Sequence, residues 1–186
     1  MQSWYEKTPD KFKFSVKAPK TITHIKRLED CKEEIERFYS VIREGLKEKL
    51  ASVLFQLPPS FSYSLERLEA IITAVNRDFN NVIEFRHESW WKQEVLEILS
   101  DNKIVFCNVN YPNLPTSVIK TTQIGYVRIH GNPKLFYSEY THEDIEALYK
   151  NVKSQNFETA YIYFNNTAST AGITNALQAK KMNQEL

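Results

Sequence analysis

The chain has 186 residues, with 24 Lys and Arg against 23 Asp and Glu and a net charge of +1. It is long enough for one domain with a core, and it gives no overall charge argument for binding nucleic acid or an anionic membrane. Its four glycines cannot form a glycine-rich phosphate loop, and no apolar run indicates a signal peptide or a membrane span. Cys31 and Cys107 lie far apart in the sequence and are typical of reduced thiols, so we expect a cytoplasmic protein.

The first half of the chain alternates between strand and helix patterns. Residues 1–9 indicate the end of a helix, and the alternation of apolar and polar residues over 12–18 predicts a strand. Apolar residues at helical spacing then predict an amphipathic helix over 30–50. A second strand is predicted over 52–57, where two prolines end it, and another helix over 64–77.

The second half continues the same pattern. Strands are predicted over 82–86, 104–109, 126–130 and 160–164. Helices are predicted after the first of these strands, from an N-cap at Thr141, and over 171–182. The connection over 110–122 is polar and interrupted by prolines, so no full helix is expected there.

Six strand–helix pairs predict an α/β fold with a parallel sheet. The repeat is about 31 residues per unit, which is also the unit length of a complete (β/α)8 barrel of roughly 250 residues. The chain therefore has the length of about six of eight units of a TIM-barrel-like fold. An open doubly wound sheet is the alternative, and periodicity alone does not decide between the two.

Several stretches, taken together and in order, resemble one family. They are Phe12–Ala18 with Thr23-His24, Phe55–Pro59, Glu84–His87 followed by Ser89-Trp90, Tyr126–Gly131, and Tyr161–Thr167 with Asn175-Ala176. This combination is similar to the YecE-like family, also called domain of unknown function 72, and the resemblance covers essentially the whole chain.

The resemblance implies a TIM-barrel-like fold and no settled activity. Members of the family normally begin with two further strands and a helix. This chain begins inside what would be the second helix, so we expect a single barrel domain over residues 1–186 that lacks the first two strands. Its last loop, 166–172, matches the family only loosely.

Inward-pointing side chains near the carboxyl ends of the strands line the active site of such a barrel. If apolar residues face the outer helices, polar strand residues point inward. On strand 82–86 this gives Glu84 and Arg86 the same face, where opposite charges are costly unless they are paired or used. The inward set is Lys17, Gln56, Glu84, Arg86, Arg128, His130 and Asn165.

Glu84 and His130 are the candidate catalytic residues of this set. A His at a strand end is well placed as an acid, base or ligand, and Gly131 after it permits close approach of a ligand. The alternatives are a structural ion-pair network of Glu84 with arginine and a structural hydrogen bond of His130. His87 is a further substrate-binding candidate that alternatively caps or packs the helix it opens.

Other basic and metal-binding groups give weaker patterns. His24 lies beside Lys26 and Arg27 in a loop that either binds a phosphate or is solvated. A metal site would need the barrel to bring together Glu84, His87, His130 and Asn165, and no local ligand spacing supports one. The cofactor is therefore unknown, with a divalent metal as a variant only.

Two main hypotheses of function remain open. In the first, a hydrolase or lyase acts on a small anionic or phosphate-containing substrate, which Lys17, Arg86 and Arg128 orient while Glu84 and His130 act as acid and base. In the second, the chain is a non-catalytic barrel fragment that binds ligands, or pairs its open sheet edges with a second copy or an N-terminal partner fragment. Nucleic-acid binding is a third alternative, and the net charge weighs against it.

Overall fold

The computed structural model describes residues 1–185. The chain divides into two compact units, residues 1–104 (unit 1) and 105–186 (unit 2). Each unit contains three parallel strands connected through helices or loops. Whether the two units act as the single domain expected from the sequence stays a prediction.

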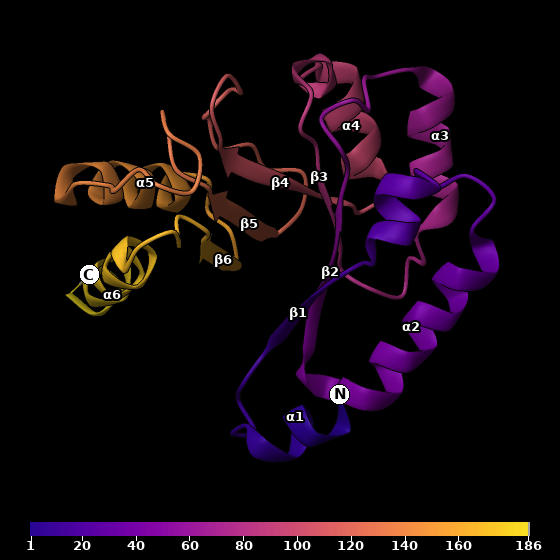
Figure 1. Cartoon of the computed structure of the whole chain (residues 1–186), viewed down its shortest axis with the longest axis horizontal. Helices are drawn as coiled ribbons and strands as arrows, with labels where there is room; N and C mark the ends of the chain where they lie inside the picture. Colours follow the sequence, from indigo (N-terminus) through magenta and orange to yellow (C-terminus); the bar gives the residue numbers. More distant parts are fainter. Residues whose placement is uncertain (186) are drawn as a thin grey trace. The chain divides into compact units, whose positions relative to one another are not determined.

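Unit 1 contains three parallel strands in the order β1-β2-β3, and α2, α3 and α4 lie on one side of them (Figure 1). The predicted amino-terminal helix and the three predicted strands are all present. The elements are α1 (Gln2–Lys7), β1 (Phe14–Lys17), η1 (Thr21–Ile25, a π-helical turn), α2 (Lys32–Leu46), η2 (Lys47–Lys49), β2 (Leu50–Gln56), α3 (Leu65–Ala74), β3 (Asn81–Glu84), η3 (Glu88–Trp90) and α4 (Gln93–Asp101).

Helix α2 forms where the sequence repeats apolar residues at helical spacing, and it buries Ile35, Tyr39 and Ile42 against the sheet. The helix is shorter than predicted. Lys47 has a φ of +47° and turns the chain away from the helix axis, so α2 ends at Leu46 and not near residue 50. Strand β2 then starts at Leu50, two residues earlier than predicted.

Unit 2 contains the parallel strands β4 (Val105–Asn110), β5 (Ile124–Ile129) and β6 (Thr159–Phe164). Helices α5 (His142–Ser154) and α6 (Ala171–Glu185) lie side by side (Figure 1). The predicted N-cap is confirmed, because Thr141 and Asp144 form a reciprocal capping box at the start of α5. In the described connection 111–123, neither helix nor strand forms, as predicted.

The core of unit 2 lies between the sheet and α5. Val127 and Ile129 of β5 pack with Val152 of α5, and Ile162 and Phe164 of β6 pack against the same cluster. Alternation along β5 and β6 therefore directs one set of side chains to the helix and the other set to the opposite face. That opposite face carries the polar residues of interest.

The strand–helix repeat with parallel pairing confirms the predicted fold class: α/β, TIM-barrel-like, with six of eight β/α units among residues 1–185. Among these described residues, no helix combines the length and the apolar character that crossing a membrane requires.

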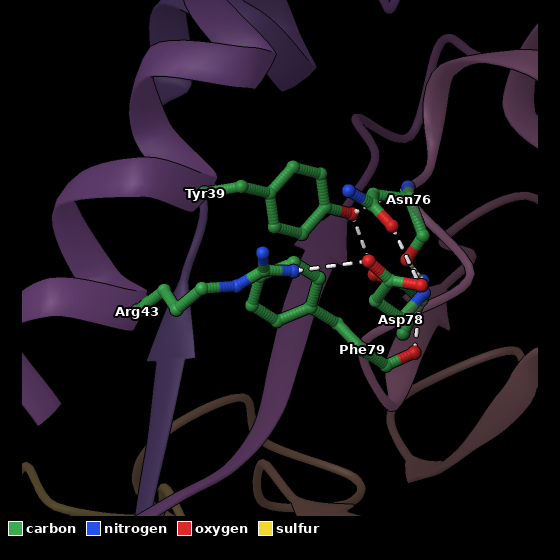
Figure 2. A network of polar contacts seen from close by, with 6 residues as sticks. Tyr39, Arg43, Asn76, Asp78 and Phe79 are labelled. Atoms are coloured by element: carbon green, nitrogen blue, oxygen red, sulfur yellow. Dashed lines mark hydrogen bonds and ion pairs between the residues drawn. The ribbon is translucent and has the colours of Figure 1, made fainter. Parts of the chain in front are cut away.

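A polar network connects α2 with the loop before β3. Figure 2 shows Tyr39, Arg43, Asn76, Asp78 and Phe79 of this network. The buried Tyr39 hydroxyl donates to Asn81 Oδ1 at 2.6 Å and accepts from the backbone N–H of Asn76 at 3.2 Å. The Arg43 guanidinium lies 4.6 Å from the centre of the Phe79 ring and 3.2 Å from Asp78 Oδ2. The network lies at the amino end of β3, where a barrel places groups that serve stability.

Candidate functional site

Three of the predicted site residues, Lys17, Gln56 and Glu84, share one face of the unit 1 sheet. Gln56 and Glu84 are register partners in the parallel pair β2–β3, and Lys17 is the partner of Leu54, two residues before Gln56. Because side chains alternate, these polar groups leave the sheet on the side opposite Phe55, whose ring contacts Tyr39 of α2. The register therefore places Lys17, Gln56 and Glu84 on one face, as their alternation predicted, and their position inside a barrel stays a prediction.

Glu84 and Arg86 are joined by an ion pair in which the Glu84 side chain is fully buried and that of Arg86 is 8% exposed. Strand β3 ends at Glu84, so Arg86 extends from the connection that leads to η3. Both the Nε and an Nη atom of Arg86 contact the same carboxylate oxygen. The charge of Glu84 is thus compensated locally, which agrees with the structural alternative for this residue.

Lys17, Gln56 and His24 form a chain of polar contacts. Lys17 Nζ donates to Gln56 Oε1 at 2.6 Å, and Gln56 Nε2 lies 3.4 Å from His24 Nε2. On the other side of the imidazole, Nδ1 lies 2.8 Å from Thr23 Oγ1. The π-helical turn η1 presents Thr23 and His24 to the end of β2, and such turns occur frequently at functional sites.

The surroundings of His24 are basic. Its pKa is lowered from the ordinary value first by burial and then by the positive charges of Lys17, Lys20 and Arg86. Cations drawn from β1, from the turn before η1 and from the residues after β3 therefore act on one imidazole ring. We call Lys17, Lys20, His24, Gln56 and Arg86 the basic cluster.

His87 has a different role in the described contacts. It is the N-cap of η3, where its Nδ1 accepts from the backbone N–H of Ser89 at 3.3 Å and lies 2.8 Å from Ser89 Oγ. This is the capping alternative of the sequence analysis. In the basic loop, Lys26 forms an ion pair with Glu34, and Arg27 extends toward Ser60. The two side chains therefore have different partners.

The polar candidates of unit 2 also share one face of their sheet. Arg128 lies on β5 and His130 directly follows its last residue, and the last register pair, Ile129 with Phe164, brings His130 and Asn165 next in line on the two strands. Asn165 donates its backbone N–H to the carbonyl of Ile129 at 2.6 Å, which fixes the end of β6 beside His130. The Oδ1 atom of Asn165 is buried and makes no hydrogen bond within the described chain.

His130 is held in an aromatic setting. It is 2% exposed, and its ring lies edge-on to those of Tyr111 and Phe136 at centroid distances of 5.8 and 6.5 Å. Gly131 has a φ of +93°, and a Cβ atom there would lie 2.7 Å from the Lys134 carbonyl oxygen. The glycine therefore permits close approach by the chain's own loop, and close approach by a ligand at this position stays a prediction.

The structure thus brings the predicted residues together in two groups. Lys17, Gln56, Glu84 and Arg86 gather in unit 1, and Arg128, His130 and Asn165 in unit 2. A site shared by Glu84 and His130 stays a prediction. Among residues 1–185, no group of three or more His, Cys, Asp and Glu side chains is arranged to hold a metal ion.

A large cavity of unit 1 lies outside the basic cluster. It has a volume of about 740 Å³ and lies between α2 and α3, on the helix side of the sheet. Of the described residues that line it, none belongs to the basic cluster. We therefore define the basic cluster by its charges and contacts.

His24 was named in a basic loop and in a stretch that carries the family resemblance, but it was not included among the predicted site residues. Its partner Gln56 is 32 positions away in the sequence, so no local spacing connects the two. The available signal was the pair Thr23-His24, which follows shortly after the strand that ends in Lys17. Lys20 gave no signal of its own.

Comparison with known proteins identifies the family of this chain and supports its fold. The family described as "Protein of unknown function DUF72" matches residues 1–186. The crystal structure of a DUF72 family protein (TM1631) from Thermotoga maritima MSB8 superposes with a TM-score of 0.88 and 31% identity over 96% of this chain and 76% of that one. A DUF72 family protein (EF0366) from Enterococcus faecalis V583 gives a TM-score of 0.85 at 22% identity, over 98% and 82% of the two chains, and supports the fold alone. The UPF0759 protein YunF of Bacillus subtilis is 25% identical over 95% of this chain and 75% of its own.

Proposed function

This chain belongs to the DUF72 family, whose description assigns no activity, and on that premise we propose from the site itself that it binds a small anionic compound at the carboxyl ends of β1 to β3. The observation that carries the proposal is the basic cluster. Three cations of unit 1 act on the partly buried ring of His24. Glu84 offsets the charge of Arg86, but Lys17 and Lys20 still add positive charge near His24, and positive charge favours an anion.

The chemistry of the cluster suits a carboxylate or a phosphate. Arg86 supplies a planar guanidinium whose position is fixed by Glu84, and Lys17 supplies an ammonium group fixed by Gln56. Charge-assisted hydrogen bonds from such groups are short and strong. Pre-positioned donors also reduce the entropy that the protein loses when the ligand binds.

The finer part of the proposal is the reaction. We infer a hydrolase or lyase in which the bound anion is oriented by Lys17, Arg86 and Arg128. His130 and Glu84 are its acid–base candidates. The position of His130 at the carboxyl end of β5 supports this part, since active sites of this fold use residues at strand ends.

The binding part is tested by titrating sulfate and inorganic phosphate into the protein by calorimetry at low ionic strength. Wild type is expected to bind both, and Lys17→Met to lose at least tenfold in affinity. Lys11→Met removes an equally exposed charge outside the basic cluster and is the matched control, with unchanged affinity expected. Absence of binding to wild type, or an equal loss in both variants, contradicts the proposal.

The catalytic part needs a separate measurement. A panel of phosphate esters and carboxylate substrates is assayed with wild type, His130→Ala and Glu84→Gln, with and without Mn²⁺. Any activity found is expected to fall at least a hundredfold in His130→Ala. If both variants keep the activity of wild type, the assignment of acid and base is wrong, while anion binding stands.

A further inference from the structure

The contacts of His24 form a complete chain of donors and acceptors. Lys17 can only donate, so the atom of Gln56 that it contacts at 2.6 Å is the amide oxygen. The amide nitrogen of Gln56 consequently faces His24 and the carbonyl of Leu57, which lies 3.1 Å away. The two amide hydrogens thus have two acceptors, the Leu57 oxygen and the Nε2 atom of His24.

The chain fixes the tautomer of His24. Because the Gln56 amide nitrogen is a donor only, Nε2 of His24 must carry a lone pair. The single proton of the neutral ring is then on Nδ1 and is donated to Thr23 Oγ1 at 2.8 Å. Thr23 in turn donates its hydroxyl hydrogen to the Pro19 carbonyl at 3.3 Å, which completes the chain.

Protonation of His24 in the free protein would disrupt this arrangement. A second proton on Nε2 would direct an N–H group at the N–H of Gln56, and it would add a positive charge beside Lys17, Lys20 and Arg86. Burial and these three cations lower the pKa of His24. An oxyanion bound among these cations favours the protonated ring. It accepts the hydrogen on Nε2, and its negative charge offsets the added positive charge.

We propose that His24 is the proton-carrying ligand of the anion site. It is neutral with Nδ1 protonated in the free protein, and it takes one proton from solvent at Nε2 when an oxyanion binds. The protonated ring then donates from Nε2 to an oxygen of the anion, and Gln56 releases it. This inference rests on the proposed anion binding and deepens it, because it makes the site selective for oxyanions at lower pH.

The sign of the pH dependence follows from linkage. The bound state holds one more proton than the free state between the lowered pKa of free His24 and its higher pKa beside the anion. Within that window the affinity rises as the pH falls, by up to about tenfold per pH unit for one proton. The charged groups that act on His24 are Lys17, Lys20 and Arg86, and Glu84 faces the cluster as the partner of Arg86.

Sulfate is the appropriate probe, since it does not titrate between pH 5.5 and 8 and any pH dependence belongs to the protein. Calorimetry in two buffers of different ionisation enthalpy measures the proton uptake. We expect wild type to bind sulfate more tightly toward pH 5.5 with uptake of about one proton. His24→Gln is expected to bind with a weak, pH-independent affinity, whereas His142→Gln, at the exposed start of α5, keeps the wild-type slope.

A second measurement needs no variant. Nitrogen-15 NMR of the imidazole rings distinguishes the two neutral tautomers, and we expect His24 of the free protein to carry its proton on Nδ1. An Nε2–H tautomer overturns the inference. So does sulfate binding that is independent of pH, or a slope that survives in His24→Gln; both of these leave the proposed anion binding intact. Wild type that binds no sulfate at any pH overturns the proposed function and this inference together.

Discussion

Glu84 and Arg86, two residues apart at the end of β3, form an ion pair. The side chain of Glu84 is fully buried, and that of Arg86 is 8% exposed. A buried charge is tolerated only with such a partner, because the interior does not replace the lost hydration. The pair therefore links the fold to the site. It holds Arg86 in the basic cluster and also stabilises the end of β3.

Replacing one member of this pair is expected to destabilise the protein more than replacing both. Arg86→Met leaves Glu84 buried without its arginine, and we expect the free energy of unfolding in urea to fall by about 3–5 kcal/mol. The double variant Glu84→Gln with Arg86→Met is expected to recover a large part of that loss. A double variant less stable than Arg86→Met would show that the pair is not the cause.

The network of Figure 2 gives a prediction for stability alone. In Tyr39→Phe, the Asn81 oxygen and the Asn76 N–H each lose the hydroxyl, so we expect a loss of about 1–3 kcal/mol in urea unfolding. Tyr149→Phe is the matched control, because its hydroxyl bonds Asn183 on the surface, and a change within about 0.5 kcal/mol is expected. If Tyr39→Phe and Tyr149→Phe lose the same free energy of unfolding, the buried network does not contribute more to stability than a surface hydrogen bond. Sulfate binding is expected to be unchanged in both.

Alkaline titration tests the contacts around Gly131. The Tyr140 hydroxyl donates to Asn110 Oδ1 at 2.7 Å and accepts from the Gly131 N–H at 3.0 Å, and burial raises the pKa of Tyr140 to about 12. The folded protein thus keeps this proton at a pH where the unfolded chain releases it. The contribution of Tyr140 to stability is complete below pH 10 and is lost as the pH rises to about 12.

In Tyr140→Phe, this part of the alkaline decline should disappear from urea unfolding measured between pH 9 and 11. The ultraviolet titration of the folded protein should also lose one late-ionising phenol. A phenol titration that is unchanged from wild type would contradict the assignment to Tyr140.

Gln56→Glu places a carboxylate inside the basic cluster. The new side chain has the shape of the old one, accepts from Lys17, and can also accept from protonated His24. We therefore expect the pKa of His24 to rise in an NMR titration and sulfate binding to be lost. The control Gln123→Glu changes an exposed residue in unit 2 and is expected to alter neither property. Tight sulfate binding in Gln56→Glu would mean that the anion lies elsewhere.

The strand faces could be predicted from the sequence because alternation is a local property. Glu84 and Arg86 were assigned to one face and Phe85 to the other, and the ring of Phe85 indeed stacks on the buried Trp90. The Thr141 cap was likewise predicted from four consecutive residues. Helix ends were less accurate. Helix α2 ends where Lys47 adopts a positive φ, which its side chain does not indicate.

The site was only partly predictable for a physical reason. Lys17 and Gln56 were identified from their strands, but the role of His24 depends on the pairing of β1 with β2 and on the turn η1. Such contacts join distant segments and have no sequence period. The contact at Gly131 was not predicted for the same reason, since the group that approaches it comes from the loop at Lys134.

The most direct test of the anion site is a crystal structure of the protein soaked with selenate at pH 5.5, with anomalous diffraction to locate selenium. The account predicts a selenium peak within hydrogen-bonding reach of Lys17 Nζ and His24 Nε2, with the contact between Gln56 and His24 lengthened from its present 3.4 Å. A basic cluster without selenium, in crystals that take up selenate at other positions, would contradict it.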